Sequence, residues 1–353
     1  MIEMTELLKK LCAIHGPTAH EWEIQKMMAS LFNEMGVECE GDAIGNLYAM
    51  QPGQGGLNLA LVAHADEIGL QIHSITDCGL LKFRKIGGLR ASSLDGHRVT
   101  ILSEFGNIPG VIGSDPMNDN GTDTGLLVRT DDLWIDIGAE SREQAEQMVS
   151  IGDFALFEAV FSILGNRRVA SKALDDRLGL CVLLSAMNRL RSESLNLNLL
   201  AISTVQEEIG MRGIKCCHKP IDLAIIIDVD YATDVPSKHP EMGYLAIGKG
   251  VGVNLNADSN PVLLKLLMDV AAEHNIMIQK TVSRNLSGGT DATLLQTQGN
   301  IATINVNLPL RYMHTHAEVC DMRDVDSAVE LIVEMVKAID KLSDVDFVPW
   351  RNL

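Results

Sequence analysis

The chain has 353 residues, of which 46% are hydrophobic and 22% are charged, and its formal net charge is -18. This length predicts two domains, or one domain that carries an insertion. Phosphate backbones and anionic lipid headgroups would repel so acidic a protein, and we therefore expect neither nucleic acid nor a membrane among its partners.

Seven cysteines are scattered along the chain without a C-x-x-C pair. An odd number without a regular spacing favours reduced thiols and therefore a cytoplasmic protein. The opening stretch MIEMTELLKKLCAIHG mixes charges into a helical pattern, and no apolar run reaches the length of a membrane span. We therefore expect neither a secretory signal nor an inserted helix.

The first long helical pattern follows Thr18. Thr18 and Glu21 have the spacing of a capping box, and apolar residues recur at helical period as far as Met35. A buried strand, LNLALVA, is predicted next, and it ends at His64.

Residues from about 70 to 163 differ in composition from the rest of the chain. Short segments rich in Val, Ile and Phe are separated by glycine, which predicts a small β-barrel or sandwich. We therefore predict an α/β domain made of residues 1–69 and 164–353, with an all-β domain inserted at 70–163. Inside the insertion, SDPMNDNGTDTG predicts an exposed loop at about 114–125, to which we assign no role.

After the insertion, strands alternate with helices. The strand patterns are LNLNLLAISTV, DLAIIID and IATINVNL, and helical patterns begin at Asp175, at Pro261 and at about Asp326. This alternation predicts an α/β fold with a mixed, largely parallel sheet flanked by helices. Binding sites in such sheets form at the carboxyl ends of the strands.

Carboxylates and histidines gather at these predicted strand and helix ends. They are His64, Asp66, Asp175, Asp176, Glu207, Glu208, Asp228 and His314. Two adjacent carboxylates where a buried strand ends are costly unless a positive charge meets them. Oxygen and imidazole ligands from separate segments suit two metal ions roughly 3.5 to 4 Å apart, with one bridging carboxylate. The sequence therefore predicts a two-metal site.

Single members of this set have simpler interpretations. Asp175 could merely cap a helix, His64 could be a core histidine, and Glu207 with Glu208 could be a solvated turn. Their coincidence at four element ends favours metal ligands. In extended backbone, adjacent side chains point in opposite directions, so one glutamate could bind metal while the other faces a water molecule.

Along nearly its whole length the sequence resembles the two-metal aminopeptidases that include the glutamyl, deblocking and tetrahedral (TET) enzymes and FrvX-like bacterial relatives. The matching segments, in chain order, are DAIGNLYA, VAHADEIG, DLWIDIGAESREQA, SKALDDRLG, TVQEEIGMRG, IIIDVD, GKG, SGGTDA and LRYMHTHAEV. Their order and spacing make the match specific. The resemblance implies a zinc-peptidase-like α/β fold with an inserted barrel or PDZ-like domain, and it implies removal of N-terminal residues from peptides.

The resemblance also implies five metal ligands for two divalent ions in each subunit. They are His64 and Asp228 for one ion, Glu208 and His314 for the other, and Asp175 as the bridge. The choice of Asp175 over Asp176, and of His314 over His316, rests on this resemblance. Zinc or cobalt is expected, and manganese is also compatible with carboxylate and imidazole ligands.

Two further residues receive catalytic roles by resemblance. Glu207 is implied as the general base that takes a proton from the attacking water and passes it to the leaving amine. Asp66, two residues after His64, is implied as the carboxylate that holds the other imidazole nitrogen of His64.

Four residues are candidates for binding the substrate. Gly288 and Gly289 in SGGTDA permit a close backbone approach, and Asp291 could receive the terminal amine or line the first pocket. Lys249 in GKG is a further candidate near the site. The family's relatives also suggest a homo-dodecamer built from dimers, assembled through the inserted domain, whose interior admits peptides.

Besides a sugar-cleaving enzyme, which is a distant third, two alternatives stay open at this stage. One is a two-zinc N-acyl amino-acid deacylase or carboxypeptidase, and the other is a non-catalytic cage protein that binds metal only structurally. The uninterrupted QEE, DDR and SGGTDA motifs favour the aminopeptidase, and a protein without activity would usually have lost Glu207.

Overall fold

The computed structural model describes residues 3–115, 129–236, 245–282, 289–342 and 346–352. Gly288 and most of the predicted loop at 114–125 lie outside these ranges. Within them, no helix is both long enough and apolar enough to cross a membrane.

The main domain is built on a mixed sheet of eight strands. In spatial order these are β1 (Cys39–Gly41), β2 (Leu47–Gln51), β12 (Asn198–Thr204), β3 (Asn58–His64), β13 (Leu223–Tyr231), β16 (Ala302–Leu310), β14 (Val251–Asn254) and β15 (Ile278–Thr281). The strands β12, β3, β13 and β16 form a parallel centre, and antiparallel pairs flank it. The predicted α/β fold with a largely parallel sheet is confirmed.

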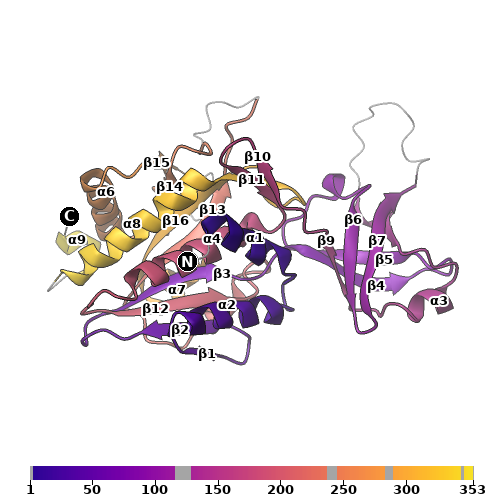
Figure 1. The fold of residues 1–353 in the computed structure, drawn as a ribbon, viewed down its shortest axis with the longest axis horizontal. Coiled ribbons are helices and arrows are strands. Elements are labelled where there is room, and N and C mark those ends of the chain that lie inside the picture. Colours follow the sequence, from indigo (N-terminus) through magenta and orange to yellow (C-terminus); the bar gives the residue numbers. More distant parts are fainter. Residues whose placement is uncertain (1–2, 116–128, 237–244, 283–288, 343–345, 353) are drawn as a thin grey trace.

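Helices cover both faces of this sheet (Figure 1). One face packs against α1 (Met4–Ala13), α2 (Trp22–Glu34), α4 (Leu174–Leu190), α6 (Pro261–Glu273) and α8 (Met322–Asp340). The other packs against α5 (Arg212–Lys215) and α7 (Asp291–Gly299). The short helix α9 (Pro349–Asn352) lies against α6.

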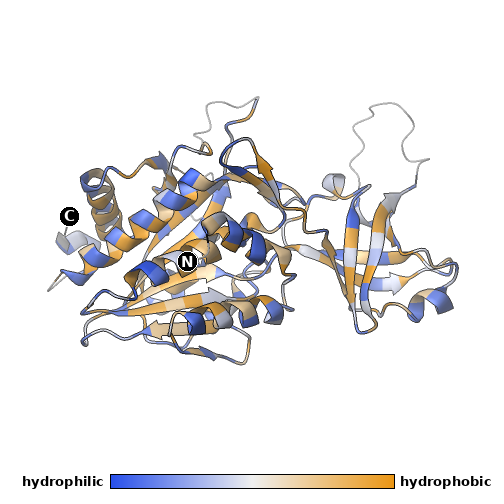
Figure 2. Ribbon diagram, in the orientation of Figure 1, coloured by the Kyte–Doolittle hydropathy of each residue, from blue (hydrophilic) through white to orange (hydrophobic). Residues whose placement is uncertain are grey.

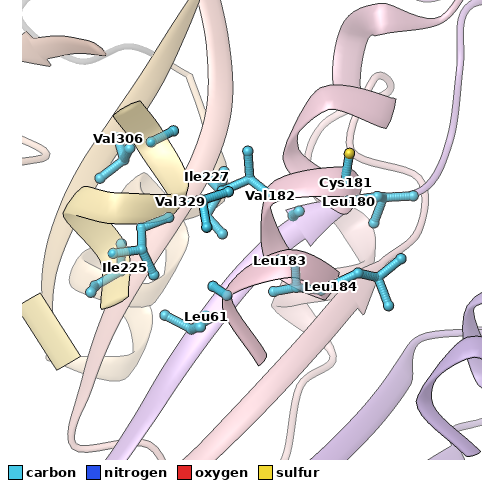
Figure 3. Packing of buried hydrophobic residues seen from close by; sticks show 14 of the residues in the cluster. Leu61, Leu180, Cys181, Val182, Leu183, Leu184, Ile225, Ile227, Val306 and Val329 are labelled. Carbon is cyan, nitrogen blue, oxygen red and sulfur yellow. The ribbon is translucent and has the colours of Figure 1, made fainter. Parts of the chain in front are cut away.

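The larger core lies between the sheet and the helices α4 and α8. Figure 3 shows Leu183 and Val329 from these helices beside Leu61 of β3 and Ile225 of β13. The central strands are coloured mostly as hydrophobic in Figure 2. Strands that are covered on both faces need such continuous apolar runs, and their sequences show them.

The inserted domain is a closed antiparallel barrel of six strands. In order around the barrel they are β4 (Gly69–Ile75), β5 (Leu81–Ile86), β8 (Leu133–Asp136), β7 (Gly106–Ser114), β6 (Arg98–Ser103) and β9 (Phe154–Phe157). The helix α3 (Arg142–Glu146) and two 3-10 turns, η1 (Ala91–Ser93) and η3 (Thr130–Asp132), join them. The barrel has its own apolar core, and Figure 1 shows it beside the main domain.

A small sheet of three strands lies where the chain returns from the barrel. It consists of β10 (Ser162–Leu164), β11 (Arg168–Ser171) and β17 (Glu318–Asp321). The chain passes from β11 into α4 and from β17 into α8. This sheet therefore positions the start of α4 close to the segment before α8.

The predicted capping box before α2 is wrong. The helix begins at Trp22, and neither candidate side chain caps it. The Thr18 hydroxyl instead donates to Asp66 at 2.8 Å, and the Glu21 carboxylate accepts the N–H of Gln206 at 3.1 Å. Both side chains therefore bind residues that follow the strands β3 and β12, and they are not available to cap the helix.

Candidate metal centre

The carboxyl ends of the four parallel strands lie side by side. Thr204 of β12 is opposite His64 of β3, and Asp228 of β13 is opposite Asn307 of β16. Side chains alternate between the faces of a strand, so these four residues point toward the face that α7 covers. These residues therefore lie together at the carboxyl edge of the sheet.

Two imidazoles converge on the carboxylate of Asp175 at the start of α4. His64 Nε2 lies 3.1 Å from Asp175 Oδ1, and His314 Nε2 lies 3.2 Å from Asp175 Oδ2. His314 Nε2 is also 3.5 Å from Glu208 Oε2. One carboxylate thus joins segments that are far apart in the sequence.

Two groups of side chains have the composition of metal sites. His64, Asp175 and Asp228 form one, and Asp175, Glu208 and His314 form the other. In each group, one donor atom from every residue lies within 4.8 Å of the others. Asp175 belongs to both groups, and together they contain the five residues that the resemblance implies as ligands.

Asp66 holds the turn that carries the two glutamates. Its carboxylate accepts the backbone N–H of Glu207 at 2.9 Å and that of Glu208 at 3.2 Å. His64 Nδ1 lies 3.1 Å from the backbone oxygen of Asp66 and 3.4 Å from its carboxylate. Asp66 therefore orients both an imidazole and the glutamate turn, whereas the sequence suggested only the first contact.

The two glutamates lie in a turn and not on extended backbone. The backbone of Gln206 has a positive φ of 57°, so the chain leaves the extended direction of β12 before it reaches Glu207. Glu208 enters one of the two ligand groups, and Glu207 enters neither. The expected extended backbone at the two glutamates is therefore wrong, because the backbone oxygen of Glu207 closes a turn by accepting the N–H of Gly210 at 2.8 Å.

The alternative ligands lie elsewhere. Asp176 accepts the N–H of His64 at 3.3 Å and that of Gly179 at 2.9 Å, so its carboxylate binds the end of β3 and the first turn of α4. The His316 ring contacts that of His97 in the barrel domain, with 3.6 Å between ring centroids and the planes tilted by 37°. Neither side chain belongs to the two ligand groups.

Glu318 is a site residue that the sequence interpretation missed. Its buried carboxylate accepts the backbone N–H of Asp175 at 3.1 Å and that of His314 at 2.9 Å. It therefore positions two residues of the ligand groups at once. A glutamate directly before Val319 and Cys320 is the signal that could have revealed it.

A buried ion cluster supports the segment that follows β3. Glu67 pairs with Lys172 at 2.6 Å and with Arg177 at 3.5 Å, and Arg177 also donates to the backbone oxygen of Ala65 at 2.7 Å. Burial alone would raise the pKa of Glu67, but the two cations hold that pKa below its usual value. Glu67 therefore stays ionised, and the cluster links the end of β3 to the start of α4.

Burial disfavours the charged form of most carboxylates of the site. Burial raises the pKa of Glu207 and of Glu208 well above the usual value, and it raises that of Asp228 to about 7. Burial would also raise the pKa of Asp175, but hydrogen bonds from His314 and His64 outweigh it and lower that pKa.

In the described part of the chain, no lysine or arginine forms an ion pair with Glu207, Glu208 or Asp228. The buried Oε1 atom of Glu208 also has no hydrogen-bond partner. Since buried anions require compensating charge, this donor set fits metal cations.

The barrel domain contributes backbone to the site. A side chain at Gly88 would clash with the imidazole of His314, and a Cβ at Gly87, whose φ is 75°, would lie 2.9 Å from Glu208 Oε2. The turn after β5 therefore needs glycine to approach the ligand groups. The sequence interpretation placed this turn inside the inserted domain and connected it with no site residue.

The predicted substrate residues have different surroundings. Asp291 is buried at the start of α7, where the Thr204 hydroxyl donates to it at 2.7 Å and its Oδ1 atom has no partner. Gly289, with a φ of 72°, lies two residues before it. Lys249 is exposed in a turn that Asp324 holds through the N–H of Gly248 and of Gly250, at 2.6 and 2.7 Å. Asp291 is thus the candidate that borders the row of strand ends.

A carboxylate and histidine site at the edge of a mixed sheet, with an inserted barrel, is the arrangement of a metallopeptidase. The model of the M42 glutamyl aminopeptidase family matches residues 45–331, a range that contains both ligand groups. The chain belongs to this family and is an aminopeptidase, a hydrolase of peptide bonds. The family predicted by the sequence resemblance is confirmed.

Relatives and solved structures agree over almost the whole chain. The lysyl aminopeptidase of Pyrococcus furiosus is 31% identical over 354 residues, covering 98% of this chain and 99% of its own. The structure of a TET aminopeptidase from a marine sediment Thaumarchaeota archaeon is 30% identical with a TM-score of 0.90, covering 96% of this chain and 97% of its own.

A third relative is the TET1 peptidase of Pyrococcus horikoshii, which can assemble into a tetrahedron or a large octahedral shell. It is 34% identical with a TM-score of 0.85, and the match covers 95% of this chain and 99% of that one. A further TET1 structure, 33% identical with a TM-score of 0.84, contains a dodecamer in its asymmetric unit and covers 97% of this chain and 100% of its own.

Proposed function

We propose that this aminopeptidase binds two divalent metal ions and removes residues one at a time from the amino end of peptides. The observation that carries the proposal is that two ligand groups share Asp175. His64 and Asp228 would complete the site of one ion, and Glu208 and His314 that of the other. Zinc or cobalt is our first expectation, with manganese also compatible. Bound in this way, such ions lower the pKa of a water molecule and polarise the scissile carbonyl.

Glu207 is our candidate for the general base. It follows the strand end directly, lies outside both ligand groups, and is held through its N–H by Asp66. Burial, with the carboxylates of Asp228 and Asp291 nearby, raises its pKa. A carboxylate with a raised pKa can take a proton from water near neutral pH and return it to the leaving amine.

Asp291 is our candidate for receiving the free amino terminus. Its Oδ1 atom is a buried acceptor without a partner, and its carboxylate acts electrostatically on both Glu207 and Asp228. An ammonium group would supply the missing donor. This requirement for a free amine, together with membership of the family, favours an aminopeptidase over the deacylase and the non-catalytic cage.

Metal removal tests the proposed function. We expect about two ions per chain, loss of activity on aminoacyl p-nitroanilides after treatment with a chelator, and recovery after addition of zinc, cobalt or manganese. N-acetylated aminoacyl p-nitroanilides serve as the control and should not be cleaved. Activity that survives complete metal removal, or preferred cleavage of the acetylated substrates, would contradict the proposal.

We further propose that the chain forms a homo-dodecamer built from dimers, with the inserted domain in the contacts. The supporting observation is a set of exposed apolar side chains on the barrel and on the segment that returns from it. They are Phe105, Val111, Ile151, Val160, Ile163 and Leu164. Exposed apolar side chains that gather into one patch mark association surfaces, and Val160, Ile163 and Leu164 lie within five residues of one another.

Light scattering tests the assembly. Twelve copies of the 38.4 kDa chain correspond to a mass of about 460 kDa. We expect this mass for the natural sequence and a smaller one for the double variant Val160→Asp and Ile163→Asp. A monomer in the natural protein would refute the assembly, and an undiminished mass of the variant would exclude these two residues from the contacts.

All seven cysteines are free thiols. This supports our proposal that the protein acts in the reducing cytoplasm. Recovery of the protein from the medium of intact producing cells would contradict it.

A further inference from the structure

The strand β13 carries a second carboxylate beyond the candidate ligand Asp228. Asp230 lies two residues further along and therefore on the same face of the strand, about 7 Å away along its axis. Its carboxylate accepts the N–H of Tyr231 at 2.7 Å and the side-chain amide of Asn254 at 3.3 Å. No ion pair joins Asp230 to any residue that the structure describes. It is a carboxylate without a cation next to the candidate metal centre.

The neighbouring Asn254 adds an acceptor that lacks a donor. Its side chain is 5% exposed, and its Oδ1 atom has no hydrogen-bond partner although its Nδ2 atom binds Asp230. A carboxylate and a carboxamide oxygen thus lie together, and neither meets a positive charge. Buried polar atoms without partners are rare in folded proteins, and such an atom calls for an explanation.

The strand β16 between β13 and β14 extends this polar surface. Asn307 lies opposite Asp228 on β13 and opposite Gly252 on β14. Asn305 and Asn307 are both buried, and the Nδ2 atom of each has no partner. A carboxamide rotated by 180° presents its oxygen in place of its nitrogen. The surface from Asp228 toward Asn254 therefore offers several hydrogen-bonding groups that no described residue uses.

We propose that Asp230 and Asn254 form the pocket for the first side chain of the substrate and select a cationic one, lysyl or arginyl. This inference rests on the proposed function, which places the N-terminal residue at the metal centre. The long flexible stem of lysine, or the guanidinium of arginine, can carry positive charge from that position toward Asp230. An ammonium brings three donors, which suit the carboxylate and the Asn254 oxygen together.

Other first residues fit this pocket less well. A glutamyl or aspartyl side chain would meet Asp230 as a like charge. A leucyl side chain would cover the carboxylate and the Asn254 oxygen without giving either a donor. A site built to hydrogen-bond its substrate discriminates strongly against analogues that lack the bonding group.

Hydrolysis kinetics test the pocket. With the metal-loaded enzyme we expect kcat/KM for lysyl and arginyl p-nitroanilides to exceed that for leucyl p-nitroanilide by about tenfold or more. Asp230→Asn keeps the shape and removes the charge, so it should lower the lysyl-to-leucyl ratio by about tenfold. Asp230→Lys should shift the preference toward glutamyl p-nitroanilide. Asp269→Asn changes an exposed carboxylate that pairs with Lys265 on α6, and it should leave the ratio as it is.

A binding measurement keeps this test independent of turnover. In calorimetric titrations of the metal-loaded protein, L-lysine should bind about tenfold more tightly than L-norleucine, which lacks only the terminal ammonium. Asp230→Asn should abolish this difference. Metal content and circular dichroism of each variant would show whether its fold and its metal centre are intact.

Three results would overturn the pocket. The first is equal or tighter binding of norleucine by the natural protein. The second is an unchanged lysyl-to-leucyl ratio in a folded, metal-loaded Asp230→Asn protein. The third is an equal loss on every substrate in that variant, which would assign Asp230 to the amine that all substrates share. Absence of any hydrolysis, with lysine still bound more tightly than norleucine, would refute the proposed function and leave the pocket standing.

Discussion

Glu207→Gln is expected to lower kcat by about 10²- to 10⁴-fold while the protein keeps its metal ions. Glutamine has nearly the shape of glutamate, so the backbone bond from residue 207 to Asp66, which is 2.9 Å long, can persist. The amide cannot take a proton from water, and so the variant loses the step that we assign to this carboxylate. Glu207 lies in neither ligand group, which is why metal content should change little.

Kinetics and elemental analysis of the same preparation check this expectation. Glu6→Gln, which changes an exposed glutamate on α1, is the matched control and should behave like the natural protein. Loss of an ion in the Glu207 variant would mean that Glu207 is a ligand and that its role has been exchanged with that of Glu208. Full activity would remove Glu207 from the mechanism.

Asp175→Ala is expected to release both metal ions and to reduce activity to background. Asp175 is the residue common to both ligand groups, and its two oxygens face two different imidazoles, at 3.1 and 3.2 Å. Removal of this carboxylate deprives both metal sites of one ligand and of one compensating negative charge. Activity then disappears, because neither the water nor the carbonyl is activated without the ions.

Native mass spectrometry measures the number of ions that each chain holds. His314→Ala is the informative comparison, because it removes a ligand from one group only and should cost the ion of that group. Circular dichroism would establish that both variants are folded. Two ions retained by the Asp175 variant would refute the bridging assignment, and two ions retained by the His314 variant would exclude His314 as a ligand.

Local patterns in the sequence were sufficient to predict the fold class. Apolar runs of strand length alternate with helical periods outside the insertion, and the glycine-punctuated segments inside it form the barrel. Element ends were less predictable. The helix α8 begins at Met322, before the predicted start at Asp326, because the Asp321 side chain caps it by accepting the N–H of Arg323. The strand β13 continues past Asp228 to Tyr231, because β16 pairs with it that far.

Candidate ligands could be predicted because parallel strands bring their carboxyl ends to one edge of the sheet. Ligands bind at this edge in α/β proteins, so acidic residues and histidines there are candidates for binding. The same reasoning could not find Glu318, whose role is to bind the backbone of residues 175 and 314. It could not find Gly87 and Gly88 either, because a glycine in a barrel turn looks the same whether or not a ligand lies beside it.

The sequence by itself determined the periodicity of each element and the types of side chain at the strand ends, since these are local properties of the chain. It also determined the family, through the order and spacing of its motifs. The tertiary structure alone decided which distant side chains meet. It places Asp175 between two imidazoles, assigns Thr18 and Glu21 to strand ends and not to a helix cap, and leaves Asp230 without a cation. Such contacts depend on distances of a few ångströms between segments far apart in the chain, and only the packing of the whole fold sets those distances.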